Sequence, residues 1–157
     1  MTTIKTLRLS LGLLAVTAGA SVAQAAPQPA EAEVMAVVKR IFDGMHEADS
    51  AKVRTAFAPG ARFVNVGTRQ NPDTITYDSI DGWLTGIARS NKQWEERISN
   101  VRIHVDANIA SAWMDYVFVL GGAVRHCGVD SIELVKVKGE WKITQLVDTR
   151  RMTGCGG

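Results

Sequence analysis

Four polar side chains that could transfer protons lie close together in the second half of the sequence: Asp115, Tyr116, His126 and Asp130. His126 is the strongest candidate for a general acid or base, because histidine ordinarily titrates near neutral pH. Asp130 follows four residues later, which on a strand puts both side chains on one face but about 13 Å apart. The two are therefore not direct partners, and a histidine with a purely structural hydrogen bond is the alternative.

Tyr116 alternates with Met114, Phe118 and Leu120, so these side chains share one face of a strand. That face is apolar and is expected to point inward. Two interpretations stay open: the tyrosine packs in the core with its hydroxyl satisfied by a neighbour, or the hydroxyl is a hydrogen-bond donor in a pocket.

Arg150 follows an expected strand and could clamp a carboxylate of a ligand through its planar guanidinium. Pairing with Asp130 or Asp148 is the alternative. No metal site is expected, because His46 and His104 have no partners at ligand spacing. The glycines lie at turns and no nucleophile motif is present, so no cofactor is predicted either.

The amino end has the three parts of a secretory signal. Lys5 and Arg8 precede an apolar run, 9–20, and Ala23-Gln24-Ala25 has the small-x-small form of a cleavage site. The run is shorter than the ~20 residues that span a bilayer, so an uncleaved anchor is the weaker alternative. We expect a signal peptide at 1–25, a flexible leader at 26–30 and one domain at 31–157, in the periplasm or secreted.

Charge and cysteine content fit an exported domain. Without Lys5 and Arg8, 16 basic residues balance 16 acidic ones, which leaves no basic excess for nucleic acid or a membrane surface. Cys127 and Cys155 are the two cysteines, and an even count in an exported chain favours a disulfide. It would stabilise the fold by about 3 to 4 kcal/mol in the chain-entropy model, provided that the glycine-rich tail doubles back.

Apolar spacing predicts helices first and strands later. Helices are expected from residue 31 to about 45, over 51–57 and from 79 to about 89. A short strand, 62–66, precedes a polar loop, 67–76. Strands over 94–105, 109–120, 124–137 and 141–149 should then form an antiparallel meander.

The register of the central hairpin is open. A two-residue turn at Gly121-Gly122 would place Val117 opposite His126, and a three-residue turn would change every pair. The register decides whether Tyr116 and His126 share the concave face.

Three segments carry a resemblance to a known superfamily: Ile-Phe-Asp-Gly-Met at 41–45, His-Cys-Gly-Val-Asp at 126–130 and Gly-Glu-Trp-Lys-Ile at 139–143. With this order of elements, the chain resembles the nuclear-transport-factor-2-like superfamily, which includes SnoaL-like and lumazine-binding-like families. The resemblance implies a cone in which helices wrap a bent sheet around an apolar pocket. Members include isomerases, dehydratases, cyclases, ligand carriers and association modules, so the fold does not choose a function.

The isomerase mechanism of that superfamily is not carried over. Ketosteroid-isomerase-like members place a carboxylate base on the first strand region, and the matching segment here contains Asn65, which cannot abstract a proton.

We therefore expect an α+β fold, with three N-terminal helices packed on a strongly curved antiparallel sheet, that binds a small apolar molecule between the sheet and the first and third helices. The expected ligand-binding residues are Asn65, Trp83, Met114, Tyr116, Phe118 and Arg150.

Two alternatives remain. The first is a cyclase, dehydratase or isomerase in which His126 is the general acid or base and Tyr116 or Asn65 polarises a carbonyl. The second is a module that dimerises or binds a partner through the opposite face of the sheet, with Trp113, Val117 and Val119 in the contact.

Overall fold

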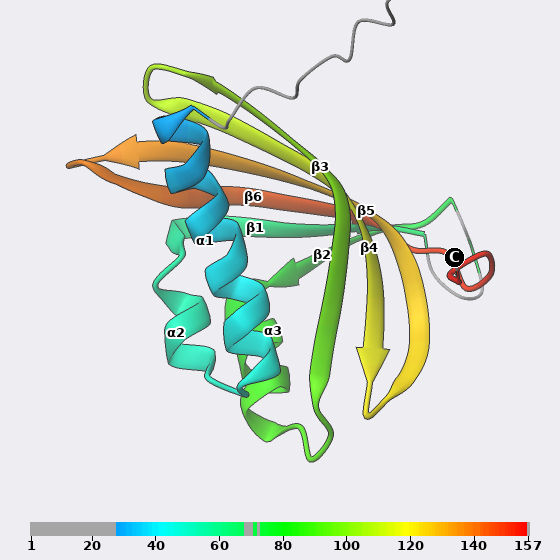
Figure 1. Ribbon diagram of the computed structural model, residues 1–157. Helices are drawn as coiled ribbons and strands as arrows, with labels where there is room; N and C mark the ends of the chain where they lie inside the picture. Colours follow the sequence, from blue (N-terminus) through cyan, green and yellow to red (C-terminus); the bar gives the residue numbers. More distant parts are fainter. Residues whose placement is uncertain (1–27, 68–70, 72, 157) are drawn as a thin grey trace, which may run out of the picture.

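The computed structural model describes residues 28–67, 71 and 73–156. Over these residues, helices cover one side of a strongly curved six-stranded sheet, which confirms the expected α+β architecture (Figure 1). The predicted signal peptide, 1–25, and the first two residues of the predicted leader lie outside the described residues. Within them, no helix is both long and apolar enough to cross a bilayer.

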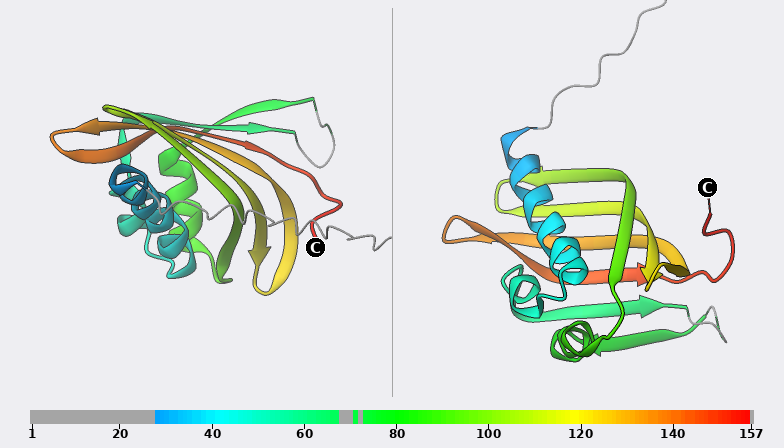
Figure 2. Two further views of the ribbon diagram at one scale, coloured as in Figure 1. Left: turned by 45° about the horizontal axis from the view of Figure 1, so that its top comes forward. Right: turned by 60° about the horizontal axis from the view of Figure 1, so that its bottom comes forward.

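Helix α1, Pro29–His46, runs across the concave side of the sheet (Figure 2). It begins two residues before the predicted start, so the end of the predicted leader is helical. Proline suits the first turn of a helix, and the Glu31 carboxylate accepts a hydrogen bond from the Gln28 backbone N–H at 3.2 Å. The predicted apolar stripe is buried against the sheet: Val34, Val37, Val38, Ile41, Phe42 and Met45.

Helix α2, Ser50–Arg54, ends three residues before the predicted end, because residues 55–56 form a turn and Phe57 already belongs to the sheet. Asp49 caps it, accepting a hydrogen bond from the Lys52 backbone N–H at 2.9 Å. Strand β1, Phe57–Val66, starts five residues earlier than expected, since Phe57 already pairs with Ile143. The Pro-Gly pair at 59–60 therefore lies inside an irregular stretch of β1 and does not separate a helix from a strand.

Strand β2, Ile75–Ser79, was not predicted; its first two residues fall in the expected polar loop. It is an edge strand that pairs only with β1, with Thr76 opposite Asn65. Its apolar side chains are exposed, Ile75 to 57% and Tyr77 to 75%, so it carries no buried stripe for sequence patterning to detect. Helix α3, Ile80–Arg89, follows at once, and Ser79 caps it by accepting from the Gly82 N–H at 2.9 Å.

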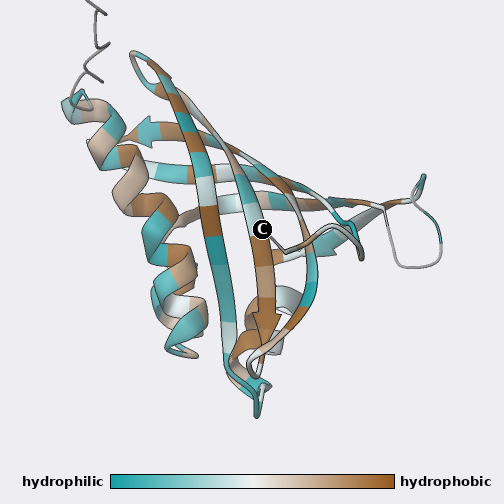
Figure 3. Cartoon of the chain, turned by 45° about the vertical axis from the view of Figure 1, so that its right-hand side comes forward, coloured by the Kyte–Doolittle hydropathy of each residue, from teal (hydrophilic) through white to brown (hydrophobic). Residues whose placement is uncertain are grey.

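The remaining strands form the predicted meander: β3 Trp94–Asp106, β4 Ile109–Leu120, β5 Ala123–Val137 and β6 Glu140–Thr149. The strand order is β2-β1-β6-β5-β4-β3, and β1 runs parallel to β6 while all other pairs are antiparallel. The long strands bend around the helices, and hydrophobic and hydrophilic residues alternate along them (Figure 3). This alternation gives the sheet one face toward the helices and one outward.

The central hairpin resolves the open register. The two-residue turn is present, with Leu120 opposite Ala123, but a bulge after Phe118 shifts the pairs beyond it by one residue. His126 therefore lies opposite Phe118, and not opposite Val117 as the regular two-residue register would have it. Tyr116 and His126 lie on the same face, with ring centroids 5.7 Å apart.

The carboxy-terminal tail is tied back to the sheet. Cys127 and Cys155 form the predicted disulfide, with Cα atoms 5.3 Å apart. Arg151 continues the pairing of the last strand: its backbone N–H donates to the Cys127 carbonyl at 2.8 Å and its carbonyl accepts from the Cys127 N–H at 3.0 Å. The tail is thus held against β5, the strand that carries His126.

Candidate functional site

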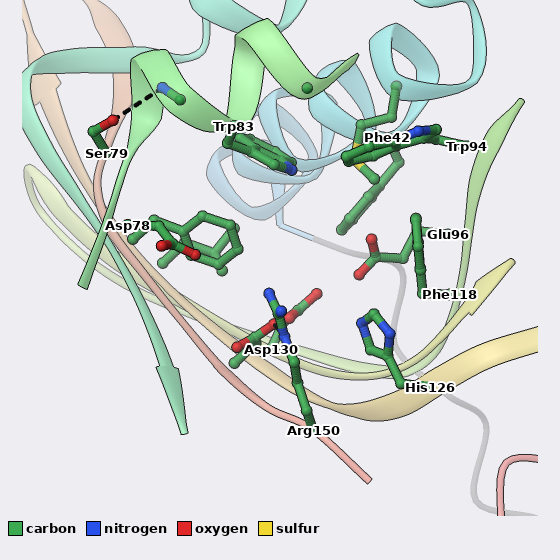
Figure 4. A pocket seen from close by; sticks show the side chains of 16 residues that line it. Phe42, Asp78, Ser79, Trp83, Trp94, Glu96, Phe118, His126, Asp130 and Arg150 are labelled. Atoms are coloured by element: carbon green, nitrogen blue, oxygen red, sulfur yellow. Dashed lines mark hydrogen bonds and ion pairs between the residues drawn. The ribbon is translucent and has the colours of Figure 1, made fainter. Parts of the chain in front are cut away.

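A cavity of about 410 Å³ lies between the concave face of the sheet and helices α1 and α3 (Figure 4). It is where the sequence places the pocket, but its lining is more polar than expected. Part of the lining is an apolar wall and part carries ionisable groups. The two parts adjoin in the sheet, where Phe118 lies between Glu96 and His126. The apolar wall includes Phe42, Met45, Phe63, Trp83, Trp94 and Phe118.

The aromatic side chains of this wall are held by edge-to-face contacts. The Trp83 ring of α3 meets Phe57 and Phe63 at centroid distances of 5.9 and 5.3 Å. Trp94 meets Phe118 at 5.4 Å, which ties β3 to β4 at the other end of the cavity. Because each ring has a neighbour at its edge, the wall is preorganised to receive a flat or apolar group.

A chain of polar contacts crosses the sheet beneath the cavity. Arg150 Nε donates to Asp148 Oδ2 at 2.9 Å, and the Arg150 guanidinium also donates to the Asn65 side-chain oxygen. Asn65 in turn donates from Nδ2 to Asp78 Oδ2 at 2.7 Å. Arg150 is thus paired with Asp148, one of the two partners that the sequence offered. Asn65 is only 2% exposed and lies behind the lining, where it positions the charged groups on either side.

Glu96 of β3 and Asp130 of β5 both line the cavity, and their carboxyl groups form an interacting pair. Burial, aided by the charge of Asp148, raises the pKa of Glu96 to about 8. Burial and the charge of Glu96 likewise hold the pKa of Asp130 well above its usual range. Two interacting carboxyl groups with raised pKa values do not both ionise at neutral pH, so the pair retains a proton there.

His126 lies on the concave face against Phe118, with ring centroids 4.9 Å apart. Burial, and then the charges of Arg150 and Arg125, lower the pKa of its imidazole to about 4. This differs from the expected titration near neutral pH. The ring is neutral at physiological pH, so it can accept or donate a hydrogen bond there but holds no proton to give up as an imidazolium.

Tyr116 does not line the cavity, although it lies on the inward face. Its hydroxyl donates to the Thr149 backbone carbonyl at 2.9 Å, and its side chain is 2% exposed. Burial, and next the charge of Asp148, raises the pKa of the hydroxyl, so it stays protonated. Gly128 lies directly opposite on β5, where a side chain would collide with the Thr149 carbonyl. The structure therefore favours the interpretation in which a neighbour satisfies the hydroxyl.

Of the six expected ligand-binding residues, the structure brings Trp83, Phe118 and Arg150 to the cavity and leaves Asn65, Met114 and Tyr116 behind its wall. Sequence reasoning missed Glu96 altogether. A usable signal was its position between Trp94 and Ile98 in the alternating pattern of β3, where an acid occupies an inward register otherwise filled by large apolar residues. Its pairing with Asp130 depends on sheet curvature and was not readable from spacing.

Of the three residues expected in an outer-face contact, Trp113 is 51% exposed and Val117 is half-buried. Val119 is only 1% exposed, so it does not belong to the exposed outer face. Among the described residues, no group of three or more histidine, cysteine or acidic side chains could hold a metal ion.

Comparison with known proteins identifies the family. Residues 29–147 match the model of the family described as "Putative lumazine-binding". A search of curated proteins finds no match. Among solved structures, an NTF2-like protein of unknown function from Shewanella baltica OS155 is 22% identical, with 76% of this chain and 92% of that chain covered and a TM-score of 0.61.

Two further structures have the same fold at lower identity. One is described as a putative dehydratase of the NTF2-like family from Streptomyces avermitilis, 11% identical over 79% of this chain and 97% of that chain, with a TM-score of 0.65. The other is described as a putative scytalone dehydratase from Novosphingobium aromaticivorans DSM 12444, 14% identical over 80% and 87%, with a TM-score of 0.63. At these identities the likeness concerns the fold alone. The family match spans most of the chain, so the protein belongs to this family, described as putative lumazine-binding, and it shares the fold of the NTF2-like structures.

Proposed function

We propose that this protein is exported and binds a small, largely apolar molecule with a flat ring in the cavity between the sheet and helices α1 and α3. The observation that carries the proposal is the cavity itself, about 410 Å³ and lined by aromatic side chains together with ionisable groups. Ligand sites commonly combine a mostly apolar lining with a few polar groups that fix orientation. The family description also refers to binding of a small molecule.

Two observations support export. The amino end carries the signal pattern of 1–25, and the two cysteines of the chain are joined in a disulfide. Disulfides of this kind persist in oxidising compartments such as the periplasm. Mass spectrometry of protein recovered from the periplasm tests this directly: the expected mature chain begins at Ala26, and a chain that keeps Met1 would contradict the proposal.

Native mass spectrometry of the same protein tests for a ligand. We expect an adduct that disappears on denaturation and returns when the extracted molecule is added back. Trp83→Ala should weaken this rebinding, because it removes a ring that lines the cavity. Trp113→Ala is the matched control, since it removes an indole from the outer face that is 51% exposed. Equal loss in the two variants, or no rebinding by the wild-type protein, would refute the proposal.

A second candidate function, an acid–base enzyme, is favoured by the carboxyl pair of Glu96 and Asp130. A proton held at about pH 8 next to a cavity is suited to donation to a bound substrate and to recovery in the next step. In such an enzyme the carboxyl pair would be the general acid or base, the role that the sequence analysis gave to His126. The imidazole of His126 is neutral, and the Tyr116 hydroxyl donates to the Thr149 carbonyl. Conversion of the recovered ligand by the wild-type protein but not by Glu96→Gln would support the enzymatic function. If neither protein converts the ligand, the enzymatic function is contradicted and ligand binding remains.

A further inference from the structure

We propose that the cavity selects an organic cation, a protonated amine carried on an aromatic or other apolar body. The inference rests on the proposed function and names the chemical class of its ligand. It follows from the charges around the cavity, from buried oxygens that have no donor, and from the aromatic wall.

The charges around the cavity are mostly negative. Four carboxyl groups line it, on Asp78, Glu96, Asp130 and Asp148, against one guanidinium on Arg150. The remaining ionisable ring, that of His126, is neutral. Even with one proton on the carboxyl pair, the lining has an excess of negative charge that a cationic ligand would reduce and an anionic ligand would increase.

Two buried oxygens at the cavity lack a hydrogen-bond donor. Asp130 is 2% exposed and Asp148 is 4% exposed, and among the described residues neither Asp130 Oδ2 nor Asp148 Oδ1 has a partner. The two residues lie directly opposite each other on β5 and β6 and both line the cavity. Unpaired buried acceptors are costly, so a ligand that brings N–H donors gains twice, by charge and by hydrogen bonding.

The single cation in the lining is already engaged. Arg150 donates from Nε to Asp148 and from its guanidinium to Asn65. A ligand carboxylate bound to the remaining N–H groups of the guanidinium would lie near Asp148 and three further carboxyl groups. The clamp that the sequence suggested for Arg150 is thus directed at the protein's own side chains.

The apolar wall suits the body of such a ligand. Trp83, Trp94 and Phe118 present ring surface to the same cavity (Figure 4). Aromatic rings attract cations through their quadrupole and pack against apolar groups equally well. A compact metal ion would gain nothing from this wall, whereas an arylalkyl ammonium would contact both the rings and the carboxyl groups.

Binding of the cation should be coupled to release of the proton that Glu96 and Asp130 share. The groups facing this pair are Asp148 on β6, Arg150 directly after β6, Tyr116 on β4 and His126 on β5. Helices α1 and α3 contribute Phe42, Met45 and Trp83 to the lining, none of which titrates. Between about pH 6.5 and 8 the carboxyl pair is therefore the group expected to lose a proton.

Three small probes of matched shape test the inference: 2-phenylethylammonium, 2-phenylethanol and 3-phenylpropionate, titrated calorimetrically into the mature, disulfide-bonded protein. At about pH 8.5 we expect the cation to bind ~tenfold or more tightly than the alcohol, and the acid least well. The affinity for the cation should rise by up to ~tenfold per pH unit from about pH 6.5 to 8 and then level off, while that of the alcohol stays constant. Buffers of different ionisation enthalpy should report proton release with the cation only.

Two variants test whether the selectivity for the cation depends on Glu96. Glu96→Gln should reduce the ratio of cation to alcohol affinity by ~tenfold, since it removes the shared proton and one charge. Glu95→Gln is the matched control: the neighbouring carboxylate bonds Arg97 at 2.7 Å, and its loss should leave the ratio unchanged. Should Glu96→Gln fail to fold, the wild-type pH profile decides.

The possible failures are distinct. If none of the three probes binds, the proposed function is contradicted together with the inference. If the alcohol or the acid binds as tightly as the ammonium, or if the cation affinity is flat between about pH 6.5 and 8, the cavity binds small molecules without the selectivity proposed here and the inference alone is overturned.

Discussion

Replacing Gly128 with alanine should destabilise the protein far more than the loss of a glycine usually does. Gly128 lies opposite Tyr116 in a hydrogen-bonded sheet, and its position lets the tyrosine ring pass over β5 to reach the Thr149 carbonyl. A Cβ atom here would lie 1.7 Å from the Thr149 oxygen, 2.7 Å from its carbonyl carbon and 2.9 Å from Tyr116 Cε1. Two of these three contacts are with backbone, which cannot rotate away.

The magnitude follows from two effects. Forcing an extra carbon into a packed interior costs about 1 to 3 kcal/mol. The displaced strand would also break the Tyr116 hydrogen bond, leaving buried polar groups unpaired at a further cost of about 1 to 3 kcal/mol. We therefore expect the free energy of unfolding to fall by about 2 to 6 kcal/mol, a large part of the ~5 to 15 kcal/mol that stabilises a typical domain.

Urea unfolding followed by far-ultraviolet circular dichroism measures this loss. Gly156→Ala is the control, because a Cβ at Gly156 meets no atom within 4 Å; we expect a change of less than about 0.5 kcal/mol. If Gly128→Ala unfolds within about 1 kcal/mol of the wild-type protein, the close approach between β5 and the Thr149 carbonyl is not a constraint and the reasoning is refuted.

Four further predictions concern the same strands. Tyr116→Phe removes only the hydroxyl and should cost about 1 kcal/mol in the same urea assay; a loss above about 3 kcal/mol would mean that the hydroxyl has a role besides its bond to Thr149. Reducing the bond between Cys127 and Cys155, which are 28 residues apart, should lower the free energy of unfolding by about 3 to 4 kcal/mol, and Cys127→Ala with Cys155→Ala should match the reduced protein rather than the oxidised one. Stability should fall as pH rises from about 6.5 to 8, because the folded carboxyl pair keeps a proton that the unfolded chain has lost; the slope cannot exceed ~1.4 kcal/mol per pH unit for one proton, and it should vanish in Glu96→Gln. Below about pH 6.5 the lowered pKa of His126 acts in the opposite sense, since there the unfolded chain binds the extra proton, and it offsets the slope of the carboxyl pair; in His126→Gln stability should therefore fall with rising pH in this range as well.

Much of the architecture was predictable because the chain marks it locally. The stripe from Val34 to Met45 has helical spacing, Ser79 caps α3, and Gly121-Gly122 turns the hairpin, so each element is specified by neighbouring residues. Strand β2, which was not predicted, is not specified by its neighbouring residues. Its Ile75 and Tyr77 are exposed, and only pairing with β1 makes it a strand.

The site was less predictable because it depends on long-range geometry. Trp83 and Phe118 could be anticipated from their inward registers, but the bulge after Phe118 shifted His126 by one position. Glu96 and Asp130 lie on strands that are not neighbours in the sheet, and only curvature brings their carboxyl groups together. No pattern of spacing along the sequence encodes that distance.

The parallel pairing of β1 with β6 has a consequence for how the chain reaches its native state. The first strand to be synthesised borders the last, with Phe63 opposite Leu146, and β2 is attached to the sheet solely through β1. In a nascent or truncated polypeptide that stops short of β6, β1 and β2 cannot join the rest of the sheet. The six-stranded sheet can therefore be completed only when nearly the entire molecule has been synthesised. Such long-range pairing favours slow, late folding over stepwise assembly from the amino end.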